Sequence, residues 1–359
     1  MLIAAVGPWH GLRTVMGARL WPHAAVPVWP GFATAALLWL LLIPSCRGLL
    51  DGHSPSAMLR DIIPLLFFFL PLFLHGRVRG RGADRRLILL ALSATGGAFA
   101  LRYFVLSSGK IGDGGSDGLL YLASSPAVLF TAIFLPVWAL DRYQGRPAVP
   151  GQLALEAMAL ATGLICLGAL ATTLQRGALG LSALAFALLA IPRLGRSAGL
   201  TLLAMVAIAA AGLLFADEIA LLFGLVDTKT RLVGLNGRAA EFAAVLAHLA
   251  ADPVHLAFGS GWGADFASPA VGGYRVGYTH SFISYLLLKG GIAGTAILVT
   301  AMVAVIRDLN WKAHSPAFMA ALAATALSLS VYTSYKFLGF GVVLWLLVAW
   351  GGTQQDSDG

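Results

Sequence analysis

Charged residues are scarce in this sequence. Aspartate, glutamate, lysine and arginine together fill 11% of the 359 positions, whereas hydrophobic residues fill 58% and the mean hydropathy is +0.83. About a quarter of the residues of an ordinary soluble domain are charged, so this composition excludes a water-soluble fold. It predicts an all-α polytopic membrane protein that forms a single integral membrane domain over residues 1–359.

Cysteine is almost absent as well. The two cysteines, Cys46 and Cys166, are too few for a disulfide framework or a paired-cysteine metal site. The acidic residues expected on the outer face contain no ligand-spaced pair other than the adjacent Asp217 and Glu218. We therefore expect no metal and no other cofactor. The other acidic residues of that face are Asp113, Asp117, Asp227, Glu241, Asp252 and Asp265.

The formal net charge of +8 does not indicate nucleic-acid binding, because the basic residues lie in short loops between apolar runs. Lysine and arginine are retained on the cytoplasmic side of membrane proteins. The loop 75–86 carries five arginines, whereas the connections 107–118 and 173–177 carry one basic residue each. The first loop is therefore expected inside and the two connections outside. Basic pairs mark three further inside loops: Arg142 with Arg146, Arg193 with Arg196, and Arg307 with Lys312.

Apolar stretches near the ~20 residues needed to cross a bilayer predict about ten transmembrane helices, with eleven or twelve as the alternative count. With ten spans, both termini lie in the cytoplasm. The first twenty residues contain Arg13 and Arg19 and are expected to be a cytoplasmic or interfacial lead, not a cleaved signal. The predicted spans are 24–44, 61–75, 87–106, 119–140, 153–173, 178–192, 199–223, 280–306, 317–334 and 337–350.

One long extracytoplasmic loop, at about 224–279, follows from this topology. Phe242, Val245, Leu246 and Leu249 recur at helical spacing and predict a helix at about 238–251, which Asp252-Pro253 would end. The stretch Gly259-Ser260-Gly261-Trp262-Gly263 predicts a tight turn with close backbone approach. A long ordered loop of this kind is usually functional.

Three polar residues are expected on this outer surface: Arg176, Arg238 and His280. Each also has a structural interpretation. Arg176 could be a cation that snorkels at a helix end, Arg238 could be a solvated residue of the loop helix, and His280 could cap a helix. However, an arginine in a first helical turn opposes the helix dipole and favours an anionic partner. Taken together, the three residues predict a site.

Transfer of a group from a phosphate-bearing donor is the chemistry that would need these residues. Two arginines can bind and neutralise a diphosphate through paired hydrogen bonds. A neutral imidazole can accept the proton of an attacking hydroxyl. Such a reaction would require no metal.

Three segments in order resemble motifs of the O-antigen ligase and O-antigen polymerase superfamily of bacterial lipid-linked glycan transferases. Gln175-Arg176-Gly177 resembles its Ser-Arg-Gly signature, and the segment 238–263 resembles its loop motif of an arginine-led helix, a proline and a glycine turn. His280-Ser281, with the glycines at 290–294, resembles its His-Asn motif and the Gly-Leu-Leu-Gly that follows. The resemblance covers about residues 170–300.

The resemblance implies a metal-independent membrane glycosyltransferase of the all-helical type C fold that uses no nucleotide sugar. Arg176 and Arg238 would bind the undecaprenyl diphosphate of the donor glycan, and His280 would activate the acceptor hydroxyl. Gln175, Phe242 and Ser281 depart from the usual serine, tryptophan and asparagine, which favours a polymerase for O-antigen or exopolysaccharide over a ligase that uses a lipid A core. Transfer to a protein serine is a third alternative.

Arg275, Tyr274 and Trp262 are weaker candidates for substrate contact, since a loop arginine is often solvated and an interfacial tryptophan is often an anchor. The expected location is the bacterial inner membrane, with a periplasmic active face and with other polysaccharide assembly proteins as partners. Two rival functions are a transporter or flippase for lipid-linked glycan, and a non-catalytic membrane subunit of polysaccharide export. A transporter would carry polar residues along the midplane of several spans.

Overall fold

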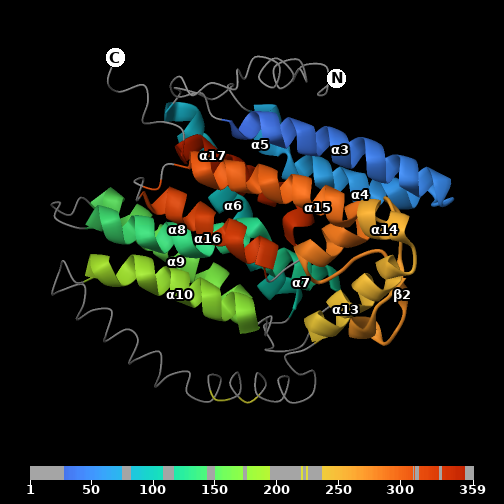
Figure 1. Cartoon of the computed structure of the whole chain (residues 1–359). Coiled ribbons are helices and arrows are strands. Elements are labelled where there is room, and N and C mark those ends of the chain that lie inside the picture. The colour runs from blue at the N-terminus through green and yellow to red at the C-terminus, as the bar shows by residue number, and fades with distance from the viewer. Residues whose placement is uncertain are drawn as a thin grey trace. The chain divides into compact units, whose positions relative to one another are not determined.

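The computed structural model is built almost entirely of helices (Figure 1). It describes residues 28–74, 82–107, 117–143, 150–172, 176–194, 237–309, 315–330 and 334–351, together with the single residues 220, 224 and 311. Within these ranges the β structure is one antiparallel pair, β1 (Phe266–Ala267) with β2 (Arg275–Val276), in which Phe266 pairs with Val276. The all-α class predicted from composition is confirmed.

Five helices in the described ranges are long and apolar enough to cross a membrane: Trp29–Leu50, Arg85–Leu106, Leu119–Arg142, Gly151–Thr172 and Phe282–Asp308. Two shorter apolar helices, Pro316–Ser330 and Leu338–Ala349, follow them. The chain is therefore membrane-embedded. The predicted span 199–223 lies outside the described residues except for residue 220.

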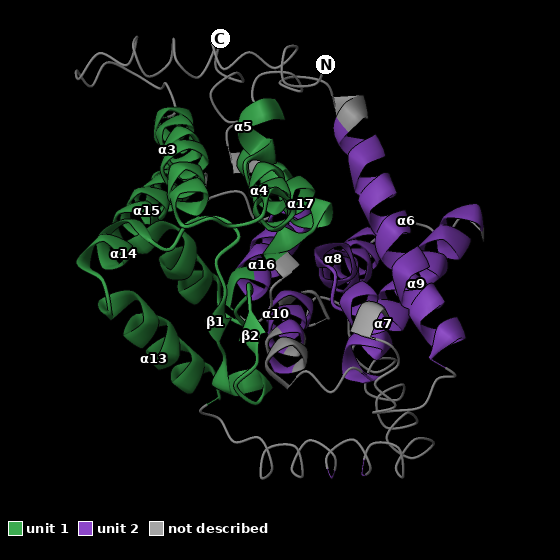
Figure 2. Cartoon of the chain, turned by 90° about the vertical axis from the view of Figure 1, so that its right-hand side faces the viewer, with its two compact units in different colours: residues 1–82, 236–313, 329–359 green, residues 83–235, 314–328 purple. Residues whose placement is uncertain are grey.

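The described chain divides into two compact units (Figure 2). One unit holds residues 1–82, 236–313 and 329–359, and the other holds residues 83–235 and 314–328. Long apolar helices occur in both units, so the single integral membrane domain predicted from the sequence stays a prediction. Arg238 and His280 belong to the first unit, whereas Arg176 belongs to the second.

The first unit contains α3 (Trp29–Leu50), α4 (Pro55–Phe68), α5 (Leu70–Leu74), α13 (Gly237–Ala250), α14 (Pro253–Phe258), α15 (Phe282–Asp308), η2 (Ser334–Lys336) and α17 (Leu338–Gly351). Its main apolar core joins α3, α4, α15 and α17, where Phe68 stacks on both Phe282 and Phe340. A smaller cluster packs Val245 and Leu249 of α13 against Phe266 and α15. This cluster fixes the loop helix on the start of α15.

The second unit contains α6 (Gly82–Leu106), α7 (Asp117–Ala123), α8 (Pro126–Tyr143), α9 (Pro150–Thr172), α10 (Arg176–Leu194) and most of α16 (Pro316–Ser330). The helices α8 and α9 pack closely because Gly163 faces Pro136: a Cβ at position 163 would lie 2.3 Å from the proline ring. Inside α8, the rings of Phe130 and Phe134 stack with centroids 5.1 Å apart.

The glycine turn after α14 is built as the sequence predicts. Gly259, Gly261 and Gly263 have φ angles of 78°, 80° and 86°, which disfavour any residue with a Cβ. Gly261 also lies against α3, where an added Cβ would be 2.3 Å from the backbone nitrogen of Gly48. The positive φ angles and the close backbone approach therefore explain the three glycines.

Trp262, in this turn, completes the hydrogen bonding of α3. Pro44 lies inside α3 and has no N–H, so it cannot bond the carbonyl of Leu40 one turn earlier. The indole Nε1 of Trp262 donates to that carbonyl at 2.8 Å, and the backbone N–H of Trp262 donates to the carbonyl of Pro44 at 3.0 Å. Polar backbone groups at membrane depth need such partners, so the turn and α3 stabilise one another.

The turn also supports a break in α15. Gly291 has φ 63° and ψ −165° and interrupts the helix. The carbonyls of Leu288 and Lys289, in the turn before the break, accept hydrogen bonds from the backbone N–H groups of Ser260 at 2.9 Å and Gly261 at 3.2 Å. The segment between α14 and β1 thus satisfies polar groups of two long apolar helices, α3 and α15.

Substituting Gly261 by alanine should destabilise the protein more than the same change at Gly273. Both glycines have positive φ angles, of 80° and 84°, but a Cβ at Gly273 would have no atom within 4 Å. The extra cost at Gly261 is that of forcing a Cβ into packed backbone, about 1–3 kcal/mol. The midpoint of thermal unfolding in detergent measures the difference, and equal midpoints for the two variants would contradict the packing described.

Candidate active site around His280

His280 lies directly before α15, on the loop that returns from β2. The cap of this helix is Ser281, whose Oγ accepts a hydrogen bond from the backbone N–H of Ser284 at 3.4 Å. The alternative that His280 caps the helix is therefore wrong. Its imidazole is 44% exposed, so it lies at the surface of the unit and its ring can meet a ligand.

Glu241 of α13 holds His280 in two places. Its Oε1 lies 3.0 Å from the imidazole Nδ1, and its Oε2 accepts a hydrogen bond from the backbone N–H of His280 at 2.8 Å. The Oγ of Ser268 donates to Oε1 at 3.0 Å. A carboxylate that accepts from Nδ1–H fixes the tautomer in which Nε2 carries the lone pair, so this pair presents a base toward the exposed side of the ring.

The fold explains why Glu241 is buried. It lies one turn before Val245 and two turns before Leu249, on the face of α13 that packs against Phe266 and α15. Its side chain has no exposed surface. Burial alone would raise the pKa of Glu241, but hydrogen bonds from the side chain and backbone of His280 and from Ser268 lower the net pKa below its usual value. Glu241 is therefore ionised at neutral pH.

The two predicted arginines lie in different units. Arg238 is in the first turn of α13, three residues before Glu241, where it is exposed and its Nη1 donates to the carbonyl of Ser330 at 3.2 Å. Arg176 is the first residue of α10, and its side chain lies outside the described residues. The structure thus joins Arg238 to His280 through α13. A shared site with Arg176 stays a prediction.

The weaker candidates differ in their accessibility. Tyr274 is 77% exposed. Arg275 is exposed and ion-paired to Asp265 at 2.5 Å, a hydrogen bond that lowers the pKa of Asp265. Trp262 is fully buried in the main apolar core. The expectation that Trp262 contacts substrate is therefore wrong, because its ring has no free face and its Nε1 is bonded to α3.

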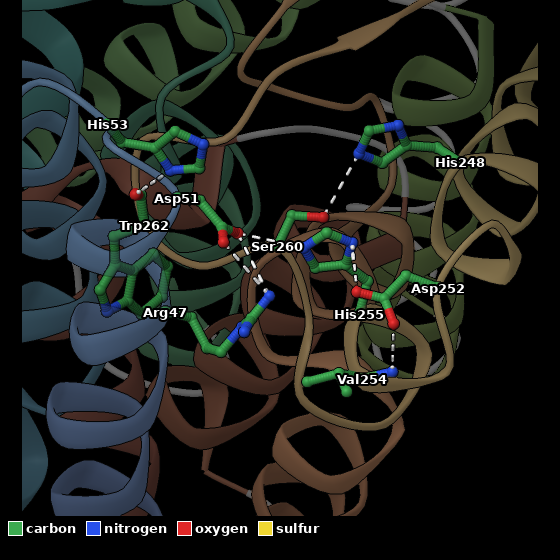
Figure 3. A network of polar contacts seen from close by, with 9 residues as sticks. All are labelled: Arg47, Asp51, His53, His248, Asp252, Val254, His255, Ser260 and Trp262. Atoms are coloured by element: carbon green, nitrogen blue, oxygen red, sulfur yellow. Dashed lines mark hydrogen bonds and ion pairs between the residues drawn. The ribbon is translucent and has the colours of Figure 1, made fainter.

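Figure 3 shows a separate polar network at the end of α3. The carboxylate of Asp51 lies between the guanidinium of Arg47, at 3.3 Å, and Nε2 of His255 on α14, at 3.1 Å. Nδ1 of the same histidine lies 3.4 Å from Asp252, which caps α14. These contacts join α14 to the connection that follows α3, and we assign them a structural role.

A serine and histidine pair in the same figure does not form a nucleophile. The Oγ of Ser260 lies 3.3 Å from Nε2 of His248, but Ser260 is buried in the glycine turn and cannot reach a substrate. Burial lowers the pKa of His248, and electrostatic interactions with His255 and Arg275 act in the same direction. The pair instead joins α13 to the turn.

Sequence reasoning missed Glu241 as a functional residue. The signal was present, because a glutamate at position i of an apolar i, i+4, i+8 stripe must be buried if the helix packs on that stripe. It also missed Asp61 of α4, whose Oδ2 lies 2.6 Å from Nζ of Lys289 and accepts from the backbone N–H of Gly263 at 2.9 Å. Within the described ranges, no group of three or more His, Cys, Asp or Glu side chains could hold a metal ion.

The fold and the site define an all-α integral membrane protein with a carboxylate-oriented histidine at the foot of a long helix. No protein-family model, no curated protein and no solved structure significantly matches the chain.

Proposed function

We propose that this protein is an extracytoplasmic glycan transferase, which moves an oligosaccharide or polysaccharide from undecaprenyl diphosphate to an acceptor hydroxyl. One observation supports it above all: the ionised, buried Glu241 bonds Nδ1 of His280 and leaves Nε2 on the exposed side of the ring. An imidazole held in this tautomer is suited to general-base catalysis.

In the proposed reaction, Nε2 of His280 takes the proton of the acceptor hydroxyl as its oxygen attacks the anomeric carbon of the donor. The bond between that carbon and the diphosphate oxygen breaks, and undecaprenyl diphosphate leaves as an anion. Arg238 and Arg176 would neutralise the leaving group. The imidazolium formed at His280 is stabilised by the carboxylate of Glu241 and later releases its proton to water.

The acceptor defines the particular enzyme. We favour polymerisation of O-antigen or exopolysaccharide on the lipid-linked chain, because the motifs at Gln175, Phe242 and Ser281 differ from the ligase pattern. Ligation to a lipid A core is the alternative. The proposal includes about ten spans with a type C glycosyltransferase fold, location in the bacterial inner membrane, cytoplasmic termini and a periplasmic site.

A transporter for lipid-linked glycan is the second candidate, and one observation favours it. Lys289 is buried with Asp61 directly before the break in α15, and broken helices with buried ionisable residues occur at transporter binding sites. Lys289 lies seven residues into the helix, about 10 Å along its axis. This support for transport consists of the one pair of Asp61 and Lys289. A transporter is expected to carry polar groups along several spans, so we rank it second.

The test is an assay of purified protein with isolated undecaprenyl-diphosphate glycan, in the presence of a chelator and without nucleotide sugar. Release of undecaprenyl diphosphate that depends on His280 supports a transferase, and the product size separates polymerisation from ligation. A wild-type protein that releases nothing but moves the glycan lipid across proteoliposome membranes would be a transporter.

A further inference from the structure

A second group of charged residues lies near His280 and takes no part in the proton transfer. We call Arg60, Lys289 and Lys336, with Asp61, the basic cluster. Its centre is the ion pair of Asp61 with Lys289, whose side chains are 3% and 0% exposed. Lys289 also donates from Nζ to the carbonyl of Ala264 at 2.6 Å. The negative charge of Asp61 is thus already used by one lysine.

The other two cations surround this pair. Nζ of Lys336 lies 4.1 Å from the centroid of the Tyr285 ring, and Nζ of Lys289 lies 5.7 Å from the same centroid. A Cβ at Gly277 would lie 2.9 Å from Nη2 of Arg60 and 3.8 Å from Nζ of Lys289, so the absence of a side chain at position 277 allows both cations to approach the same point of the backbone. The cluster therefore has three cations and one carboxylate.

The excess positive charge is partly shielded from water. The pKa of Lys336 is lowered to about 8, chiefly by burial and also by the charges of Lys289 and Arg60, against the opposing effect of Asp61. No ion pair or hydrogen bond of Lys336 to an acceptor occurs within the described ranges. Shielded cations are normally paired with an anion.

Tyr335 supplies an independent observation. It is 3% exposed, and its hydroxyl has no hydrogen-bond partner among the residues that the structure describes. Burial raises the pKa of Tyr335, and the charges of Asp61 and Glu241 raise it further, so this phenol keeps its proton. A buried donor without an acceptor is rare, and it adjoins the lysine that lacks an anion.

The cluster also adjoins the histidine. The ring of Tyr335 packs edge-on against Phe282, two residues after His280, with centroids 4.8 Å apart. By the predicted topology, the start of α4, the foot of α15 and η2 all lie at the outer membrane interface, where a lipid head group is found.

We propose that the basic cluster binds the phosphoryl group of a ligand, with Lys336 and Arg60 as its cationic contacts and the hydroxyl of Tyr335 as a hydrogen-bond donor. This assignment rests on the proposed function: the ligand is a lipid-linked diphosphate, whose anomeric carbon is the one attacked by the acceptor hydroxyl that His280 deprotonates. Lys289 positions the site and remains neutralised by Asp61.

Calorimetric titration of the full chain in detergent tests this with three probes: farnesyl diphosphate, inorganic pyrophosphate and farnesol. Wild-type protein is expected to bind farnesyl diphosphate at least tenfold more tightly than farnesol. Lys336→Met should weaken diphosphate binding at least tenfold, and Lys336→Arg should retain most of it. Equal binding of both diphosphate probes would identify free diphosphate as the ligand, whereas preference for the farnesyl form would identify the lipid head group.

Tyr335→Phe keeps the test independent of folding. Its hydroxyl has no described partner, so the variant should keep the wild-type unfolding midpoint while diphosphate binding weakens about threefold or more, as expected for one hydrogen bond. Arg307→Gln, an exposed change on α15, is the matched control for charge. Undiminished binding by both Lys336→Met and Tyr335→Phe, or farnesol binding equal to that of farnesyl diphosphate, would overturn the proposal.

The same titration separates this proposal from the transferase itself. His280→Ala should bind farnesyl diphosphate like the wild type, because the imidazole is not one of the anion contacts. If binding depends on Lys336 but wild-type protein transfers no glycan, the anion site stands and the proposed reaction fails. If transfer depends on His280 but not on Lys336, the reaction stands and the site fails.

Discussion

Glu241→Gln should reduce turnover by a factor on the order of 10³–10⁴, the effect of fixing a catalytic histidine in the wrong tautomer. The backbone N–H of His280 is a fixed donor to Oε2, so the glutamine oxygen must take that position and its NH₂ group must face Nδ1. Nδ1 then has to accept, and the proton moves to Nε2. The base is lost although the side chain keeps its size.

The measurement is the rate of undecaprenyl diphosphate release, with His280→Ala as the reference for complete loss of the base. Ser268→Ala is the matched control, since it removes one hydrogen bond from a neutral hydroxyl to the Glu241 carboxylate and leaves the pairing with His280 intact. It should cost about 1.5–3 kcal/mol of stability and little activity. Wild-type turnover in Glu241→Gln would rule out the general-base assignment.

Breaking the pair of Asp61 and Lys289 is expected to have the largest effect on stability. Removing one partner of a buried ion pair leaves an uncompensated charge, which costs about 3–5 kcal/mol. Lys289→Met removes the direct ion-pair partner of Asp61 and keeps its hydrogen bond from the N–H of Gly263, and Asp61→Asn leaves the ammonium of Lys289 inside the protein. Both single variants should unfold at clearly lower temperature in detergent.

The double variant Asp61→Asn/Lys289→Met completes the cycle. It removes both charges of the pair, so it should recover most of the stability that either single change removes. The exposed pair of Arg275 with Asp265 is the matched control, and Arg275→Ala should leave the unfolding midpoint unchanged. Additive losses in the double variant would show that the two side chains do not act as a pair.

The sequence was most informative where structure is local. Periodicity predicted the helix 238–251, and the structure places α13 at Gly237–Ala250. The glycines after α14 predicted a tight turn, and all three have positive φ angles. Both features depend on residues close in the chain, such as Asp252, which caps α14 and ends the preceding helix.

Long-range contacts could not be predicted in the same way. Glu241 binds a histidine 39 positions later, and Trp262 binds a carbonyl 222 positions earlier. A glutamate is expected to be solvated and a tryptophan to lie at the membrane interface, and neither expectation identifies a partner so far away in the sequence. The expectation for Trp262 was wrong because Pro44 leaves the carbonyl of Leu40 without its usual donor. Only the folded chain shows that Trp262 supplies that donor.

The glycine turn has one further consequence, for hydrogen exchange. The amides of Ser260, Gly261, Trp262 and Gly263 donate to acceptors on three helices: the carbonyls of Leu288 and Lys289 on α15, the carbonyl of Pro44 on α3, and the carboxylate of Asp61 on α4. An amide exchanges with solvent only when its bond opens. We expect these four loop amides to exchange as slowly as those of the membrane helices. This stretch is therefore a rigid part of the fold and does not open to admit a ligand.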